Sequence, residues 1–477
     1  MMKGFASVAA TVAIVAALLA SCSKDKEAGG IRFERSALYL APGETATVAF
    51  SLDNIKSGSL AVTSRPEGWD DITVDAAACT LSVTAPVAAA DDTDASGSVV
   101  LTGASAGDGS LASATLFVGL VPTVDLSDSP ANSYLIDRKQ TNYLLDALHR
   151  ADRSALETES VGVVWQSSSA LVQHLQLVDG KVSFYVDADS DDDTQLKEGN
   201  ALIGAYGADG TLIWSWHIWI ADYDPAGAGG SVELNGHTMM TRNLGALANA
   251  DTDDEEILAS YGMYYQWGRK EPFIGPLTFD ASNGSSAAMY NNAGTRVYLK
   301  VEASDAETGT QRYAVANPLT FITVSEKDAD WLQDAAAERW SEESKTLYDP
   351  CPYGWRVAPV SAFRDLSIAD DLTADADYAS KYGWTLTDGS SSSLFMAAGR
   401  RTWLNASIQN NFDESLLSRL GEMQPWAGYY WTGAADASLA SACCLWLKAD
   451  EVAASGVWAG RPMGRANGMQ VRCVREE

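Results

Sequence analysis

Residues 31–121 alternate apolar and polar positions in short runs, a pattern that predicts strands with one buried face. Turn-forming stretches such as "PGE", "RPEGWDD" and "GASAGDGS" separate these runs. Period-two runs at this spacing are typical of an antiparallel β-sandwich. Cys79 begins one of the expected strands, and we interpret it as a small buried residue rather than a reactive thiol.

Residues 125–230 form a second block, whose strands are expected to be covered on both faces. In "LIWSWHIWI", residues 212–220, side chains on both sides of the strand are apolar. Such a strand is sandwiched between two layers, so the block is expected to be a second β-rich sandwich module. We expect its tryptophans to be core residues rather than a sugar platform, and His217 to be a hydrogen-bonded packing residue rather than a metal ligand.

Residues 232–477 mix helical and strand patterns with much irregular chain between them. In "SEKDADWLQDAAAERW", residues 325–340, Ser325 and Asp328 make a capping box before an amphipathic helix. Ser361 is expected to cap a shorter helix. Strands are expected at "SLFMAAGRR", "GYYWTG", "ACCLWLKA" and "MQVRCVRE".

The N-terminus has the layout of a secretory signal, expected over residues 1–21. Its apolar run from Phe5 to Leu19 is shorter than the about 20 apolar residues that a membrane-spanning helix needs. The sequence "LASC" resembles the bacterial lipobox, which implies lipidation of Cys22 and attachment to the outer membrane. An ordinary signal peptide with an incidental cysteine is the alternative. The charged tether, residues 22–30, resembles the export signal of Bacteroides-type surface lipoproteins and so implies exposure on the cell surface.

Composition narrows the classes of partner. The chain has 477 residues, a length that allows two to four globular domains, and its formal charge is −30. Since nucleic-acid binding depends on neutralising phosphates, such an acidic chain without a basic block is expected to bind no nucleic acid. Without Cys22, five of the six cysteines remain. One disulfide would use two of them, and the other three have to be explained in another way.

Cys443 and Cys444 are adjacent on an expected strand. Consecutive side chains on a strand point to opposite faces, so we expect one cysteine to face inward and the other outward. A disulfide between neighbouring cysteines is strained, and two reduced packing cysteines are the preferred interpretation.

Seven motifs of the third block carry a family resemblance. In chain order they are "TRNLGA", "YYQWGRKEPF", "NPLTFI", "YDPCPYGWRVAP", "FMAAGRR", "YYWTG" and "GMQVRCV". Their order resembles that of the Fibrobacter succinogenes major paralogous domain of Bacteroidetes surface proteins, which implies a C-type-lectin-like fold for residues 232–477. The first block resembles the immunoglobulin-like modules of such lipoproteins, including the BACON type. The second resembles a segment that precedes the C-terminal domain in relatives, which often carry a cysteine where this chain has Ser133.

The C-type-lectin-like resemblance also implies a disulfide between Cys351 and Cys473. A cross-link over more than a hundred residues stabilises a loop-rich domain by about 4 to 5 kcal/mol in the chain-entropy model. We expect Trp355 to pack beneath the sulfur atoms. Arg356 is expected to make an ion pair or a carbonyl contact rather than a binding contact.

The distribution of histidines limits the chemistry of the third block. The chain has four histidines, and none lies beyond His237. The block therefore lacks the histidine of a Ser-His-Asp or Cys-His mechanism and of a histidine zinc site, so Cys351 is interpreted as structural and no enzyme is expected. A pair of carboxylates acting on a glycan is the remaining catalytic alternative.

An acidic stretch offers the best metal-like pattern. In "DADSDDDTQLKE", the carboxylates fall at the ligand positions of an EF-hand calcium loop: Asp187, Asp189, Asp191, Asp193 and Glu198. Asp192 replaces the expected glycine, and the stretch follows a strand rather than a helix. A solvated acidic hairpin tip is the preferred interpretation, and bound calcium is the alternative. The sugar-binding motifs of calcium-dependent lectins are absent, and "KEPF" at residues 270–273 is a poor substitute.

These observations combine into one hypothesis. We expect a multidomain, lipid-anchored surface protein in which two all-β sandwich (immunoglobulin-like) modules hold out an α+β C-type-lectin-like domain. Its function is expected to be binding or adhesion to a glycan or surface protein, through exposed aromatics near the loops. The candidates are Trp403, Trp426, Tyr429 and Trp458. A structural or accessory subunit of a surface fibre or glycan-uptake complex is the alternative, and a carboxylate-based glycan-active enzyme is the third choice.

Overall fold

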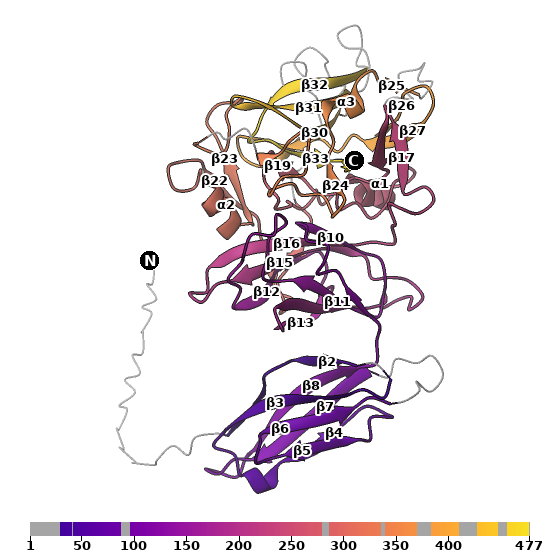
Figure 1. Ribbon diagram of the computed structural model, residues 1–477. Coiled ribbons are helices and arrows are strands. Elements are labelled where there is room, and N and C mark those ends of the chain that lie inside the picture. Colours follow the sequence, from indigo (N-terminus) through magenta and orange to yellow (C-terminus); the bar gives the residue numbers. More distant parts are fainter. Residues whose placement is uncertain are drawn as a thin grey trace, which may run out of the picture.

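The computed structural model describes residues 29–40, 42–86, 96–278, 286–334, 339–369, 383–409, 427–446 and 456–476. Figure 1 shows three tiers stacked in one direction, with the first module at one end and the C-terminal part at the other. The expected signal, Cys22 and most of the tether lie outside these ranges. No helix within them is long and apolar enough to cross a membrane.

The first module is a sandwich of two four-stranded sheets. One sheet has the order β1 (Gly30–Phe33), β3 (Thr45–Asp53), β6 (Thr80–Thr84), β5 (Ile72–Asp75). The other has the order β2 (Ala37–Tyr39), β8 (Leu111–Gly119), β7 (Ser96–Ala104), β4 (Ala61–Ser64). A 3-10 turn, Ser57–Ser59, precedes β4. The inward residues of both sheets, including Val48, Leu81 and Leu116, form one core around Trp69, as the alternating pattern predicts.

The prediction for Cys79 was wrong in part. It does not lie on a strand but in the turn before β6, where its backbone has a φ of 52°, and it is only half-buried. The strand begins at Thr80, after a turn in which the Asp75 carboxylate accepts hydrogen bonds from Ala77 and Ala78.

The second module is also a two-sheet sandwich. One sheet has the order β13 (Gln173–Val178), β14 (Lys181–Val186), β11 (Thr141–Asp146), β9 (Thr123–Asp125). The other begins β10 (Ser133–Ile136), β16 (Leu212–Ile220), β15 (Gly199–Tyr206), β12 (Ser160–Gln166). Strand β16 is covered on both faces as predicted: Trp214 and Trp216 pack into the core between the sheets, whereas Trp219 packs into a core shared with the third block.

The second and third blocks are fused rather than merely linked. Two short strands of the third block, β20 (Met289–Tyr290) and β21 (Arg296–Val297), extend the sheet of the second module beyond β12. One hydrophobic core also contains Trp165 of β12 together with Trp267 and Trp431. The expected boundary near residue 232 therefore does not separate two independent cores.

The third block is dominated by strands among the described residues. Its largest sheet has the order β29 (Ile408–Gln409), β28 (Arg400–Arg401), β33 (Gly468–Val471), β30 (Ala427–Asp436), β31 (Leu439–Trp446), β32 (Gly456–Gly464), and β19 (Tyr265–Gln266) pairs with β33. A four-stranded sheet has the order β17 (Ser231–Leu234), β18 (His237–Met240), β34 (Cys473–Arg475), β24 (Trp355–Val357). Smaller sheets pair β22 (Lys300–Ala303) with β23 (Thr320–Thr323) and order β25 (Ser367–Ile368), β26 (Gly383–Thr387), β27 (Ser392–Met396).

The helices of this block are short in the described ranges: α1 (Asp254–Tyr261), α2 (Gln311–Ala316) and α3 (Val360–Phe363). Ser361 does not cap α3, because the N-cap position is Pro359 and Ser361 lies inside the helix. The Ser361 hydroxyl instead lies 2.9 Å from Nε2 of His237, so it fastens the helix to the hairpin of β17 and β18.

The expectation that one of the neighbouring cysteines faces outward was wrong. Cys443 and Cys444 do point to opposite faces of β31, but both are fully buried and free. Cys443 packs in the core beneath α3, whereas Cys444 belongs to the core shared with the second module. Burial raises the pKa of the Cys444 thiol to about 12, which leaves both cysteines as packing residues.

Candidate functional site

A polar hollow opens at the surface of the largest sheet of the third block. Two adjoining pockets of about 140 and 160 Å³ share Lys327 and Arg400. We call this feature the arginine hollow. Its lining includes Lys327, Asp328, Arg400, Thr402, Trp403, Asn405, Gln409, Tyr429, Arg461 and Asn467. Each half has the size of a small chemical group or a single ring rather than of a drug-sized ligand, for which pockets start at about 300 Å³.

Strand pairing places the aromatic and cationic side chains of the hollow together. Tyr429 of β30 lies opposite Cys444 of β31, which in turn lies opposite Trp458 of β32, so all three share one face of the sheet. Trp458 and Arg461 are three positions apart and would point to opposite faces of a regular strand. A register shift between them, where Ala442 pairs with Arg461, brings both to the same face.

A close backbone approach forms one wall of the hollow. A Cβ atom at Gly464 would lie 2.3 Å from the carbonyl oxygen of Lys327, so only glycine lets the segment of Lys327 and Asp328 lie against the end of β32. The same segment is anchored by Asp330, whose carboxylate forms ion pairs with Arg465, at 3.0 Å, and Arg339. All three of these charged groups are buried.

This anchoring explains why the predicted helix at residues 325–340 is wrong over its described part. Residues 325–334 are irregular. The indole of Trp331 is fully buried and donates a hydrogen bond to the carbonyl oxygen of Trp267, at 2.9 Å. Buried contacts of Asp330 and Trp331 therefore override the local helical pattern, which is worth only tenths of a kcal/mol per residue.

Two buried polar atoms of the hollow lack hydrogen-bond partners within the described part of the chain. They are Nε of Arg400, a residue only 6% exposed, and Oδ1 of Asn467, which is 1% exposed. Buried polar groups are normally satisfied, because leaving one unpaired costs about 1–3 kcal/mol. The hollow thus presents an unused donor on β28 and an unused acceptor in the turn before β33.

The hollow concentrates positive charge in an acidic protein. Lys327, Arg400 and Arg461 line it together with one described carboxylate, Asp328. The guanidinium of Arg400 lies 5.1 Å from the ring centre of Tyr429, and that of Arg461 lies 4.7 Å from the ring centre of Trp458. An aromatic partner uses the face of a guanidinium, whereas carboxylates and other anions bind its in-plane N–H groups.

The structure brings three of the four predicted aromatics to this hollow. Trp403 lines the hollow and is half-buried. Trp458 is 42% exposed and lies against Arg461, which lines the hollow. Tyr429 lines it but is only 1% exposed, so the expectation of an exposed aromatic was wrong there. Trp426 lies outside the described residues.

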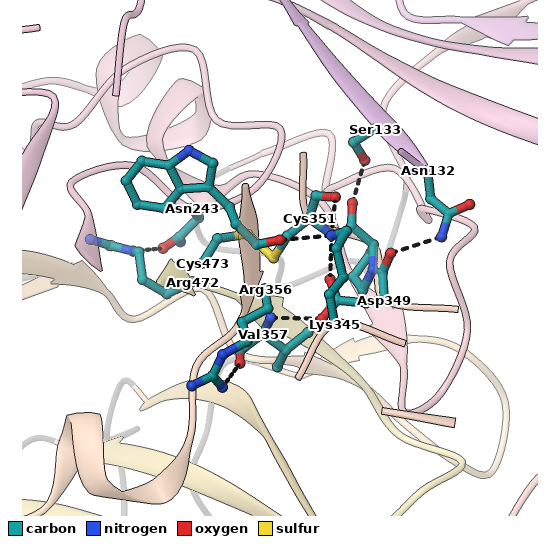
Figure 2. Close-up of a disulfide and its surroundings, with 12 residues drawn as sticks. Asn132, Ser133, Asn243, Lys345, Asp349, Cys351, Arg356, Val357, Arg472 and Cys473 are labelled. Atoms are coloured by element: carbon teal, nitrogen blue, oxygen red, sulfur yellow. Dashed lines mark hydrogen bonds and ion pairs between the residues drawn. A yellow bond between two sulfur atoms is a disulfide. The ribbon is translucent and has the colours of Figure 1, made fainter. Parts of the chain in front are cut away.

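The motif around Cys351 forms the junction between the second and third blocks (Figure 2). Cys351 and Cys473 are joined by a disulfide that spans 122 residues, which confirms the pairing implied by the family resemblance. Buried Asp349 accepts hydrogen bonds from the backbone of Cys351 and Val357, both at 2.9 Å. Lys345 donates to the carboxylate of Asp349 and to the carbonyl oxygen of Cys351, so the loop is held from both sides.

Residues flanking Cys351 are structural as expected. Trp355 is buried in the same core as the disulfide, and Arg356 donates to the carbonyl oxygen of Val357 at 3.5 Å. In the second module, Ser133 donates to the carbonyl oxygen of Pro350, a hydrogen bond across the junction.

His217 is a buried member of this junction and not a metal ligand. Its Nε2 lies 2.9 Å from Oδ1 of Asn200, whose amide nitrogen donates to Gly245. Asn200 therefore accepts, Nε2 carries the proton, and Nδ1 faces the hydroxyls of Ser133 and Tyr265. Burial lowers the pKa of His217 to about 3, so the imidazole is neutral at physiological pH.

The acidic loop does not bring its expected ligands together. The carboxylate of Asp187 accepts from Tyr185 and Gln173, whereas Glu198 accepts from the backbone of Asp222. Across the described residues, which include the whole loop, no three acidic, histidine or cysteine side chains gather as a metal site requires. The loop connects β14 and β15, which belong to different sheets, and an antiparallel bridge between Ala188 and Leu196 closes it into a small hairpin whose acidic tip is exposed, as the preferred interpretation has it.

The "KEPF" stretch is unavailable to a ligand. Lys270 and Glu271 are buried and form an ion pair at 3.0 Å, and Lys270 also donates to Ser215 of the second module. Glu271 in addition contacts Arg269, at 3.3 Å. This cluster joins the two modules and is closed to solvent.

Comparisons with known proteins add little to this geometry. No protein-family model and no curated protein matches the chain. Among solved structures, it is similar to an endo-fucoidan hydrolase of glycoside hydrolase family 107, with 16% identity, 43% of this chain and 31% of the hydrolase covered, and a TM-score of 0.15. It is similar to the D00-D0 domain of intimin (10% identity, 40% and 96% covered, TM-score 0.16). It is also similar to a protein of unknown function from Porphyromonas gingivalis W83 (12% identity, 40% and 98% covered, TM-score 0.17). TM-scores this low carry no functional argument.

Proposed function

We propose that the chain is a lipid-anchored surface protein that binds a glycan through the arginine hollow of a lectin-like C-terminal domain. The observation that carries the proposal is the convergence at one polar hollow of half-buried Trp403 and two arginines, one of which lies over the ring of exposed Trp458. Aromatic faces beside hydrogen-bonding groups suit the alternating apolar and hydroxyl-bearing surfaces of a sugar.

The position of the hollow suits a role in surface recognition. Figure 1 shows β31 and β32 at the end of the molecule opposite the first sandwich, which follows the proposed lipid anchor. The second module shares a core with the third block, so the recognition end is held by a rigid support rather than by a flexible linker.

The described lining also favours binding over glycan hydrolysis. Hydrolysis of a glycosidic bond generally uses two carboxyl groups about 5–10 Å apart. Only Asp328 supplies a carboxylate among the lining residues that the structure describes. This supports the binding hypothesis without a catalytic step.

An oligosaccharide array tests the proposal. The full chain lacking its leader and Cys22 is applied with calcium and, separately, with a chelator. We expect saccharide binding that is weakened by Trp403→Ala and Trp458→Ala but retained by Tyr298→Ala, which removes an exposed aromatic from the middle tier. Absence of binding to every saccharide would reject the proposal and favour a structural or accessory subunit.

A further inference from the structure

The unused hydrogen-bonding groups of the arginine hollow define the chemistry of its ligand. Among the described residues, Nε of Arg400 is a cationic donor that has no acceptor, and Oδ1 of Asn467 is an acceptor that has no donor. Since both side chains are more than nine-tenths buried, water replaces such partners less easily than at an open surface. A ligand that satisfies both atoms carries an anionic oxygen and a hydroxyl group.

The geometry points to an acidic saccharide as this ligand. Arg400 and Arg461 bind its carboxylate, and a ring hydroxyl donates a hydrogen bond to Oδ1 of Asn467. This inference rests on the proposed glycan-binding function and specifies the class of glycan. A guanidinium matches a planar carboxylate through paired N–H groups, and the hollow holds two guanidiniums and the ammonium of Lys327. Asp328, an exposed residue of the lining, repels a ligand that carries further negative charge on that side.

The shape of the hollow fits an extended ligand. Its two pockets adjoin at Lys327 and Arg400, so a carboxylate bound there leaves room on both sides. The pocket beyond Arg400 is lined by Trp403, Asn405 and Gln409, an aromatic face with two amide side chains. That combination suits a neighbouring neutral sugar ring. A calcium ion has no part in this mode of binding, because the positive charge comes from side chains.

Matched ligands and variants test the inference on the full leaderless chain. The probes are oligosaccharides ending in glucuronic, galacturonic or N-acetylneuraminic acid, each with its carboxyl-reduced neutral counterpart. We expect binding of an acidic member that survives calcium chelation, weakens as salt rises, and falls about tenfold to a hundredfold on carboxyl reduction or in Arg461→Gln. Arg400→Gln should act in the same direction, and Arg461→Lys should restore affinity only in part.

Arg312→Gln is the matched control, because it removes the same charge from an exposed position on α2. Arg461 is only half-buried, so its variant remains informative if replacement of buried Arg400 impairs folding. If neutral and acidic forms bind equally and Arg461→Gln has no effect, the inference is overturned while the proposed function stands. If no saccharide binds, the proposed function falls as well. Binding of polyglutamate but of no saccharide would reject a saccharide as the ligand and indicate an acidic protein partner.

Discussion

Removing the disulfide between Cys351 and Cys473 should destabilise the fused second and third blocks. The bond closes a loop of 122 residues, for which the chain-entropy relation gives about 4.9 kcal/mol at 25 °C. Cys473 pairs with Val357 of β24, and the loop before β24 holds the Cα atom of Cys351 6.0 Å from that of Cys473. We therefore expect the double variant Cys351→Ala, Cys473→Ala to lose about 5 kcal/mol of unfolding free energy.

Urea unfolding followed by tryptophan fluorescence measures this loss well. All tryptophans except Trp69 lie beyond residue 160, so the signal reports on the fused blocks and hardly on the first module. The midpoint should fall with little change in slope. Arg312→Gln, which changes an exposed side chain of α2 within the fused blocks, is the control and should change stability by less than about 1 kcal/mol. The entropic reasoning is refuted if the double variant is as stable as this control while peptide mapping confirms the bond in the parent.

Three further predictions concern buried groups. Asp330→Asn should cost about 3–5 kcal/mol, because it leaves two buried arginines without their carboxylate; a loss below about 1 kcal/mol in urea unfolding contradicts the anchoring role. The folded pKa of His217, about 3, lies below its ordinary value of 6.5, so the unfolded chain binds the proton first. The free energy of unfolding should be highest above pH 6.5 and fall by about 1.4 kcal/mol per pH unit from there towards pH 3. The His217→Gln variant should lose this pH dependence, and an unchanged slope contradicts the assignment of a neutral buried imidazole. Thiol titration of native residues 23–477 should modify Cys79 rapidly and leave Cys443 and Cys444 protected until urea unfolds the protein; rapid reaction of all three contradicts the buried pair.

Local patterns predicted the modules because each strand carries its own signal. Alternation in residues 31–121 and the doubly apolar strand β16 correspond to one-sided and two-sided burial, and the structure confirms both. The disulfide came from the family resemblance and not from cysteine spacing, which leaves several pairings open. The same resemblance supplies the lectin-like fold, which stays a proposal.

Long-range contacts account for what the patterns missed. Residues 325–334 have helical spacing, but Asp330 and Trp331 are held by partners distant in the sequence. The arginine hollow is lined by segments around residues 327, 400, 429 and 461. These segments are distant in the sequence, and they meet because β33 lies between β28 and β30 in the largest sheet. The aromatics could be nominated from the sequence, whereas the buried arginine on β28 could not. A weak signal was available in the arginines of "GRR" and "AGRP", which stand out in a chain with 63 acidic and 33 basic residues.

A crystal structure of residues 23–477 with the tightest-binding acidic oligosaccharide tests the central claim most directly. The account predicts the carboxylate within hydrogen-bonding distance of Arg400 and Arg461, a hydroxyl group on Oδ1 of Asn467, and a sugar ring near Trp403. A saccharide bound elsewhere, such as at the hollow beside Glu342 and Gly433, with the arginines untouched, would contradict it.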